Sequence, residues 1–477
     1  MTSNFIIGLV SLAVCPSLSF SLVPPTSIRT RGGGVDTRRF RLNRLNEQVD
    51  DGGIVYDVAI IGSGPASCSL ASLLTASPTG NGDTDTTEQP PNVVVLSKYA
   101  DKRWVPNYGC WTEEWSVLDQ LYSKRGVPGL MELGVDIEWK DTDCFFGEFA
   151  KDVIENPSPG IEGSTEGSYR RTVGREYLRV SREGLKDIFC GDNRNYHVIK
   201  EDVLGTATNV NVYLPGGSIT FHDTYTELTL KESNRKIKAK IVVDGTGAES
   251  PFTIRDNRDR EGYQIAYGAE CRVEGAGVTD TMVGDYDRSK MTLFDFRSEK
   301  WRNDSDLASS EEEVIRQPTF NYVMPLSKDV IFFEETSLVA NPAMSFKECK
   351  ERLVARLKSQ NVFITDILEE EFCYIPMGGG LPRKGQRIVP IGAASGLVHP
   401  STGYQVGRCL SSNLDVSEQI LAELKRHRAE SQPKFDPDAA AARIVGTIWT
   451  PEAIRRKPDL LKIDDLFTCD SQHGRPY

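Results

Sequence analysis

The sequence lacks the patterns that mark several kinds of protein. It has no C-x-x-C pair and no H-E-x-x-H motif, and its ten cysteines and five histidines are scattered. We therefore expect no metal site and no disulfide framework. No segment after the N-terminal region has about 18 uninterrupted apolar residues, so no membrane-spanning helix is predicted. The formal net charge of -12 argues against nucleic acid as a partner.

The first 50 residues differ in composition from the rest of the chain. An apolar stretch from Phe5 to Val14 is typical of a cleaved signal peptide, and residues 21–44 are rich in Ser, Pro, Gly and Arg, as in a transit peptide. We interpret residues 1–50 as a bipartite plastid presequence with Phe20 at the junction, similar to those of algae with secondary plastids. This predicts a chloroplast location; the alternative is a secreted protein with a basic linker.

Apolar runs and glycine turns alternate along the chain from Ile54. The segment "IVYDVAIIGSGPASCSLASLL" predicts a strand, a glycine turn and a helix, and "NVVVLS" predicts the next strand of a β-α-β unit. Strands dominate residues 262–338. Residues 345–361 predict an amphipathic helix with Phe346, Leu353, Val354 and Leu357 on one face. After Lys425 we expect a polar and less ordered chain.

The first glycine turn has the context of a dinucleotide-binding fingerprint. Its first glycine permits the tight turn, and its second lets a pyrophosphate approach the helix N-terminus. Ser67 replaces the usual third glycine, and Ser97 stands where an acid normally holds the ribose. A strand, turn and helix without a nucleotide is the alternative. The predicted contacts here are Gly62, Ser63, Gly64, Pro65 and Ala66.

Two more glycine turns follow apolar strands, in "VVDGTGAE" and "IVPIGAASGLVHPSTGYQVGRC". Flavoproteins use such segments along the dinucleotide and beside the flavin ring. A helix that begins near Gly403 would direct its N-terminal amides at the flavin and stabilise negative charge there. The predicted cofactor contacts in these turns are Asp244, Gly245, Gly247, Gly392, Gly403 and Tyr404.

Several further segments together resemble the lycopene cyclase family of plants, algae and cyanobacteria. They are "PNYGCWTEE", "GYQIAYG", "KMTLFDFR", "FNYVMPLS", "FFEETSLVA", "IPMGGGLP" and "VHPSTGYQVGR". The resemblance implies FAD as cofactor, NADPH as the flavin reductant, and lycopene or another C40 carotenoid as substrate. It also implies peripheral association with the thylakoid membrane, contact with other carotenoid enzymes, and ring closure without net redox change. In the family pattern His399 is a cofactor contact beside the flavin, where it would cap a turn or, as the less favoured alternative, relay a proton.

The resemblance also implies the fold class, a glutathione-reductase-type FAD-binding Rossmann domain intertwined with a mixed β-sheet substrate domain. We assign residues 54–145, 236–262 and 386–425 to the FAD-binding domain. Residues 146–235 and 263–385 are assigned to the substrate domain, and residues 426–477 to a C-terminal tail.

The motif "VIFFEET" carries the candidate catalytic residues, Glu334 and Glu335. Ring closure begins with a proton added to an alkene, a very weak base, so the acid must be a carboxyl group kept protonated by an apolar pocket. Adjacent strand residues point to opposite faces, so one glutamate would face the pocket and the other would support it. We favour Glu335 as the acid, without excluding Glu334.

A carbocation would also be stabilised by aromatic rings. The candidates are Tyr108, Trp111, Tyr322, Phe332 and Phe333, for each of which core packing is the alternative.

Three other activities fit the same patterns. One is a related cyclase that forms ε-rings or opens a carotenoid epoxide. Another is a flavin-dependent oxidoreductase or hydroxylase of the same fold, which would consume NADPH and oxygen with its substrate. The third is a non-catalytic carotenoid-binding protein, which the altered fingerprint would permit.

Overall fold

A computed structural model describes residues 54–77, 89–147, 161–163, 169–192, 194–204, 219–255, 262–378, 380–398, 405–429 and 434–449. The expected presequence lies outside this set. So do three of the predicted cofactor contacts, His399, Gly403 and Tyr404.

The described part of the first sheet has seven strands in the order β10-β11-β12-β1-β2-β9, with β20 beside β12. β1, β2, β9, β12 and β20 pair in parallel, and β10 and β11 extend the sheet in antiparallel fashion. Strands of a parallel sheet are apolar throughout because helices bury them. The strands are β1 (Val55–Ile61), β2 (Val93–Leu96), β9 (His197–Ile199), β10 (Ile219–Phe221), β11 (Thr226–Thr229), β12 (Lys236–Asp244) and β20 (Ile388–Pro390).

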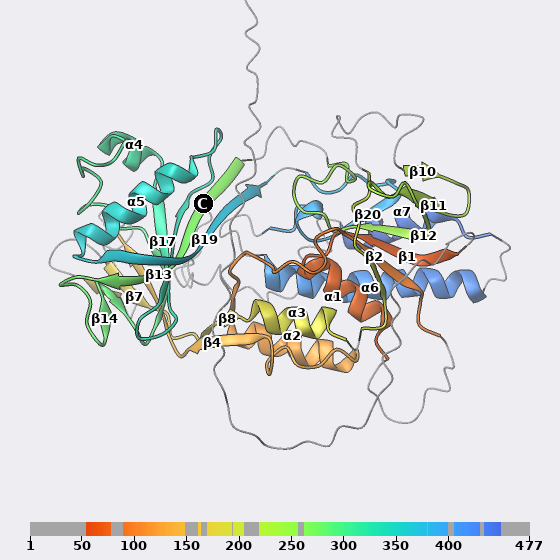
Figure 1. Ribbon diagram of the computed structural model, residues 1–477, viewed down its shortest axis with the longest axis horizontal. Helices are drawn as coiled ribbons and strands as arrows, with labels where there is room; N and C mark the ends of the chain where they lie inside the picture. Colours follow the sequence, from red (N-terminus) through yellow and green to blue (C-terminus); the bar gives the residue numbers. More distant parts are fainter. Residues whose placement is uncertain are drawn as a thin grey trace, which may run out of the picture. The chain divides into compact units, whose positions relative to one another are not determined.

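Three helices form the main core with this sheet: α1 (Pro65–Thr75), α6 (Val406–Ala429) and α7 (Pro437–Ile448). Figure 1 shows α6, in blue, running beside α1. The Asn413 amide on α6 donates to the Ala66 carbonyl at the start of α1. A second layer adds α2 (Thr112–Lys124) and α3 (Arg182–Cys190).

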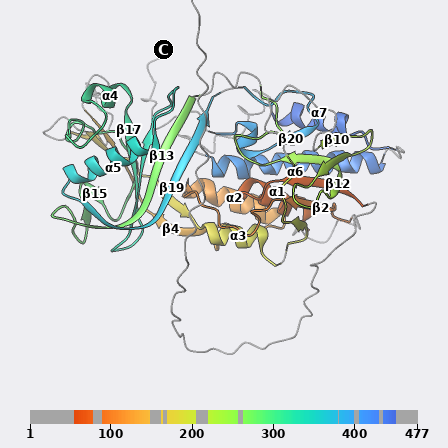
Figure 2. The same ribbon diagram turned by 45° about the horizontal axis from the view of Figure 1, so that its top comes forward.

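The second sheet has eight described strands in the order β19-β13-β18-β17-β16-β5-β7-β6. Figure 2 shows its two longest strands, β13 and β19, side by side. The strands are β5 (Thr142–Phe146), β6 (Ile161–Gly163), β7 (Tyr169–Thr172), β13 (Gly262–Glu274), β16 (Met291–Asp295), β17 (Thr319–Pro325), β18 (Ile331–Ser337) and β19 (Phe363–Met377).

Helix α5 (Phe346–Ser359) covers one face of the second sheet, over Ile265, Tyr267 and Phe333. The opposite face packs on a small sheet of β3 (Gly109–Trp111), β8 (Tyr177–Val180) and β4 (Val135–Trp139). The remaining described elements are β14 (Met282–Val283), β15 (Tyr286–Asp287), α4 (Glu311–Arg316) and the 3-10 helix η3 (Gly392–Ser395).

The structure differs from the sequence-based boundaries in four places. Strands β9, β10 and β11, expected in the substrate domain, pair into the first sheet, and β5 pairs into the second. Helix α6 continues to Ala429, and α7 follows, although we expected a less ordered chain after Lys425. Val354, expected on the buried face of α5, is 48% exposed. Pairing between distant strands decides the sheet to which each strand belongs, and local patterns do not encode it.

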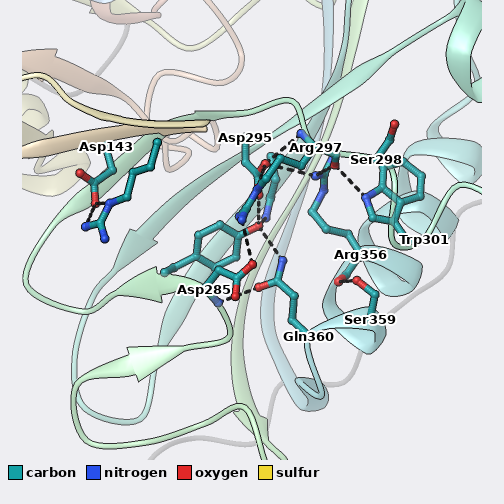
Figure 3. A network of polar contacts seen from close by, with 12 residues as sticks. Asp143, Asp285, Asp295, Arg297, Ser298, Trp301, Arg356, Ser359 and Gln360 are labelled. Carbon is teal, nitrogen blue, oxygen red and sulfur yellow. Dashed lines mark hydrogen bonds and ion pairs between the residues drawn. The ribbon is translucent and has the colours of Figure 1, made fainter. Parts of the chain in front are cut away.

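A buried charge network fixes α5 to the second sheet. Figure 3 shows Asp295, Arg297 and Arg356 at its centre. Arg356 on α5 donates to both carboxylate oxygens of Glu335 on β18, at 2.7 and 2.9 Å, and Arg297 binds Asp295 at 2.8 Å. Burial alone would raise the pKa of Asp295, but the charges of Arg297 and Arg356 outweigh it and lower the pKa. Asp295 therefore stays ionised in the interior, beside the two arginines.

Removing one member of this network should destabilise the fold. Arg356→Met would leave the buried Glu335 carboxylate without its cation and Asp295 with Arg297 alone, and breaking a buried ion pair in this way costs about 3–5 kcal/mol. We expect a lower urea midpoint with an unchanged slope. The control is Lys347→Met on the same helix, because Lys347 is 81% exposed. Equal midpoints for the two variants would contradict this account of the network.

Candidate functional site

A cavity of about 700 Å³ lies at the turn between β1 and α1. The predicted contacts that line it together are Gly62, Ser63, Gly64, Pro65, Ala66, Gly245, Gly247 and Gly392. The turns at Gly245 and Gly392 lie almost 200 and more than 300 residues after the turn at Gly62, and all three line this one cavity. A Cβ on Gly64 or Gly247 would meet no protein atom within 4 Å, so the space in front of these two glycines is open. Such a cavity at a helix N-terminus fits a dinucleotide.

Ser67, which replaces the third glycine of the fingerprint, is accommodated by the facing turn at Gly245. Ser67 is fully buried, and its hydroxyl lies 3.4 Å from the Gly245 carbonyl. A Cβ on Gly245 would lie 2.1 Å from the Ser67 oxygen. Gly62 has a φ of +101°, and a Cβ there would lie 2.6 Å from the Gly245 carbonyl oxygen. The helix and strand therefore approach closely with serine in the third position.

The ribose end of the cavity also differs from the common pattern. Ser97 accepts a hydrogen bond from Ser63 at 3.0 Å and lines the cavity, as the position of a ribose contact requires. The carboxylate found in this lining is Asp202, from the loop after β9. Asp101 is outside the lining and pairs with Lys200 at the surface. Sequence reasoning missed Asp202 because β9 joins the sheet from a distant segment.

Asp244 does not line the cavity, although we predicted a cofactor contact there. Its side chain is fully buried and accepts hydrogen bonds from Thr246, Ser250 and Thr253. The carboxylate orders the turn that carries Gly245 and Gly247, and so acts on the cavity through the backbone.

A second cavity, of about 390 Å³, lies between the second sheet and the small sheet. Tyr108, Gln405 and Val406 line both cavities, so the two share a wall. Most of the second lining is aromatic or aliphatic, and its ionisable acid is Glu334. The lining includes Tyr108, Trp111, Tyr177, Phe294, Phe320, Tyr322, Glu334, Phe372, Cys373 and Tyr374.

The two glutamates of β18 have opposite surroundings. Glu335 is fully buried in the charge network with Arg356 and accepts a hydrogen bond from Thr319 at 2.5 Å. Glu334 lines the second cavity and accepts a hydrogen bond from Thr336 at 2.8 Å. Strand alternation separates them as predicted, but Glu335, which we favoured as the acid, faces away from the cavity.

A third glutamate, Glu371 on β19, approaches Glu334. One carboxylate oxygen of each lies within 4.8 Å of the other and of the Cys373 sulfur. Glu371 accepts a hydrogen bond from the Asn107 backbone N–H at 2.7 Å. Sequence reasoning missed Glu371, one of three consecutive glutamates. The sequence feature that could have identified it is strand alternation, which places Glu371 and Cys373 on one face.

Both carboxyl groups of this pair hold their protons more tightly than usual. Burial raises the pKa of Glu334. Burial, followed by the charge of Glu334 and the hydrogen bond between the two carboxyls, raises the pKa of Glu371 to about 9. The pair therefore keeps a proton near neutral pH, which fits a general acid in an apolar cavity.

The predicted aromatic contacts divide between cavity and core. Tyr108, Trp111 and Tyr322 line the second cavity. Phe332 and Phe333 are buried in hydrophobic clusters on opposite faces of the second sheet and are absent from the lining. The Tyr322 hydroxyl lies 3.2 Å from that of Tyr177, whose ring packs edge-on against Trp111. A wall of π-rich rings thus surrounds Glu334.

The fold and these cavities define a class, the Rossmann-type fold of FAD-dependent enzymes with a mixed-sheet second domain. Solved structures with this fold include the halogenase PltM, at a TM-score of 0.50 and 13% identity, covering 82% of this chain and 72% of that one. A point mutant of PltM in complex with FAD has a TM-score of 0.51 and the same coverage. The predicted fold class is confirmed.

The chain itself belongs to the lycopene cyclase family. The family described as lycopene cyclase protein matches residues 57–466. This confirms the resemblance inferred from the sequence motifs.

Relatives in the family carry different activities in their names. Lycopene beta cyclase of Capsicum annuum is 29% identical over 95% of this chain and 76% of its own length. Neoxanthin synthase of Solanum lycopersicum is 30% identical over 77% of this chain, and capsanthin/capsorubin synthase of Citrus sinensis 31% over 75%. The chain spans only 61% and 58% of those two proteins.

Proposed function

We propose that this protein is an FAD-dependent lycopene beta-cyclase that closes β-ionone rings on the linear ends of lycopene. The observation that carries the proposal is Glu334, a carboxyl group with a raised pKa in an aromatic cavity that shares a wall with the dinucleotide-type cavity. Family membership and the names of the beta cyclase relatives support it.

The reaction needs a proton at its start and releases one at its end. Addition of a proton to C2 of the terminal double bond leaves a tertiary cation at C1. The C5=C6 electron pair then forms the C1–C6 bond and moves the cation to C5, and loss of the C6 proton forms the ring double bond. Atoms and electrons balance without an oxidant, so the enzyme is an isomerase or intramolecular lyase.

We propose Glu334 as the acid, in place of our earlier preference for Glu335. The carboxyl of Glu334 faces the cavity, while Glu335 is held by Arg356 on the other face of the sheet. A positioned general acid typically contributes about 10²–10⁴-fold to a rate. The rings of Trp111 and Tyr322 would stabilise the cation beside it.

FAD would be held in the first cavity by the Gly62–Gly64 turn, the N-terminus of α1 and the ribose-end residues Ser97 and Asp202. The open space in front of Gly64 fits this assignment. Reduced FAD, when bound, supplies negative charge that stabilises a carbocation, with NADPH as the proposed reductant. The side chains of this chain supply and recover the proton.

The proposed substrate dissolves in membranes, which supports peripheral membrane association. Among the described residues no helix is long and apolar enough to cross a membrane. Phe372 and Tyr374 line the second cavity and are 55% and 48% exposed on edge strand β19, where a lipid-dissolved carotenoid could enter. The chloroplastic relatives support a plastid location, where other carotenoid enzymes would be neighbours.

A second candidate function is the opening of a carotenoid epoxide by the same acid. Neoxanthin synthase and capsanthin/capsorubin synthase are 30% and 31% identical to this chain, as similar to it as the beta cyclase of Solanum lycopersicum at 30%, which favours testing this function. An ε-ring product from lycopene would identify an ε-cyclase. NADPH consumption that depends on oxygen would identify a hydroxylase of the same fold. A carotenoid-binding protein without activity would leave all substrates unchanged.

The open space at Gly64 gives a test of FAD binding. Gly64→Ala adds a methyl group that meets no protein atom within 4 Å, so the fold should tolerate it while FAD no longer fits. We expect loss of flavin absorbance from the purified variant, with a melting temperature equal to that of the wild-type protein stripped of FAD. Ser67→Gly, one helical turn away, should keep its flavin. A Gly64→Ala protein with a full complement of FAD would overturn this assignment.

The acid assignment is tested in bacteria that make lycopene. We expect the wild-type protein to produce β-carotene, and Glu334→Gln to reduce the product at least about 100-fold while flavin binding persists. Glu370→Gln is the matched control, because Glu370 contacts Tyr267 and Lys350 away from the second cavity. Full activity of Glu334→Gln would refute the assignment.

A further inference from the structure

The two carboxyl groups at the second cavity meet across a strand that lies between their own strands. Glu334 on β18 and Glu371 on β19 are both paired in register with Gly268 on β13. Two strand spacings amount to roughly 10 Å, so side chains on β18 and β19 are normally separated by the side chain between them. Here their carboxylate oxygens lie within 4.8 Å of each other.

Glycine at position 268 is what permits this approach. A Cβ there would lie 2.7 Å from Cγ of Glu371 and 2.8 Å from the Phe332 ring. Any other residue would therefore displace Glu371 or the ring. The backbone N–H of Asn107 donates to Glu371 at 2.7 Å and fixes its carboxyl beside Glu334.

We propose that Glu371 is a positioning residue that shares one proton with Glu334, so that the pair supplies the proton for cyclisation and takes it back from the ring. The inference rests on the proposed cyclase function. Glu371 acts on the substrate only by way of Glu334, because Glu334 lines the cavity and Glu371 does not.

The pair returns to its starting protonation state after each ring closure. Near neutral pH the two carboxyls carry one proton and one negative charge, because like charges in close contact do not both form. Glu334 gives the proton to C2, and the pair then has two carboxylates that offset the carbocation. Loss of the C6 proton to Glu334 restores the starting state, and no other acid, base or oxidant is needed.

The groups around the pair set the pH at which this proton is lost. The ionisable residues that face it are Cys373, Tyr108, Tyr177, Tyr322 and Arg182. Burial raises the pKa of the Cys373 thiol and of the tyrosines above their usual values. Arg182 is the one cation in this set, and it acts against the rise in the pKa of Glu371.

The first test is the pH profile of the purified full chain, supplied with FAD, NADPH and lycopene in liposomes. Wild-type activity should fall as pH rises through about 9, where the pair loses its shared proton. Glu371→Gln removes the like charge beside Glu334, so the proton of Glu334 is lost more easily. The alkaline limb of the profile, where activity falls with rising pH, should therefore move about 1–3 pH units lower. Gly268→Ala, which forces the pair apart, should move it in the same direction.

The matched control is Glu370→Gln, whose profile should coincide with that of the wild type. A role of Glu371 in packing alone would reduce the rate at every pH and leave the limb in place. That result in both Glu371→Gln and Gly268→Ala would overturn the proposal.

The second test needs no activity and so separates this inference from the proposed function. Infrared titration of the purified protein should show a protonated carboxyl band that persists at neutral pH and disappears near pH 9. Neither Glu371→Gln nor Glu334→Gln should show a carboxyl that titrates there. The absence of such a band in the wild type, or an unchanged band in Glu371→Gln, would refute the pair even if lycopene is cyclised.

Discussion

The alternation of side chains along β18 is the constraint on which the site depends. It sends Glu335 to the face covered by α5 and Glu334 to the opposite face, toward the aromatic cavity. The two faces of the sheet therefore give the two carboxyl groups different surroundings. Arg356 binds Glu335 in a charge network, whereas burial against an apolar wall raises the pKa of Glu334. One strand thus provides a rigid anchor and the proposed reactive group on consecutive residues.

The anchor and the reactive group are mechanically connected through this strand. Because Arg356 binds Glu335 with both donors, the backbone at Glu334 cannot shift without breaking buried ionic contacts. The network also joins α5 to β16 and the turn after it through Asp295 and Arg297. The proposed proton transfer to carbon requires positioning to a fraction of an ångström, and the buried network on the far face would supply it.

The sequence predicted the elements of the site better than their grouping. The glycine turns at Gly62, Gly245 and Gly392 were identified from local patterns, because a strand followed by a glycine turn is a local signal. The position of Glu371 depends on the register of three strands around Gly268, which no local pattern specifies. For the same reason the sequence favoured Glu335 as the acid, whereas we propose Glu334: the partner of Glu335, Arg356, lies 21 residues away on a helix. Ser67 was recognised as an exception, but the facing Gly245 that accommodates it lies 178 residues along the chain.

We propose above all that a carboxyl group of the protein protonates a carotenoid double bond and recovers a proton from the ring. Cyclisation of lycopene in D₂O, with NADPH followed in the same sample, tests it most directly. The account predicts one deuterium per ring at C2, since the carboxyl pair exchanges with solvent before turnover, and no NADPH consumed in proportion to product. An unlabelled product, or one NADPH oxidised for each ring formed, would contradict it.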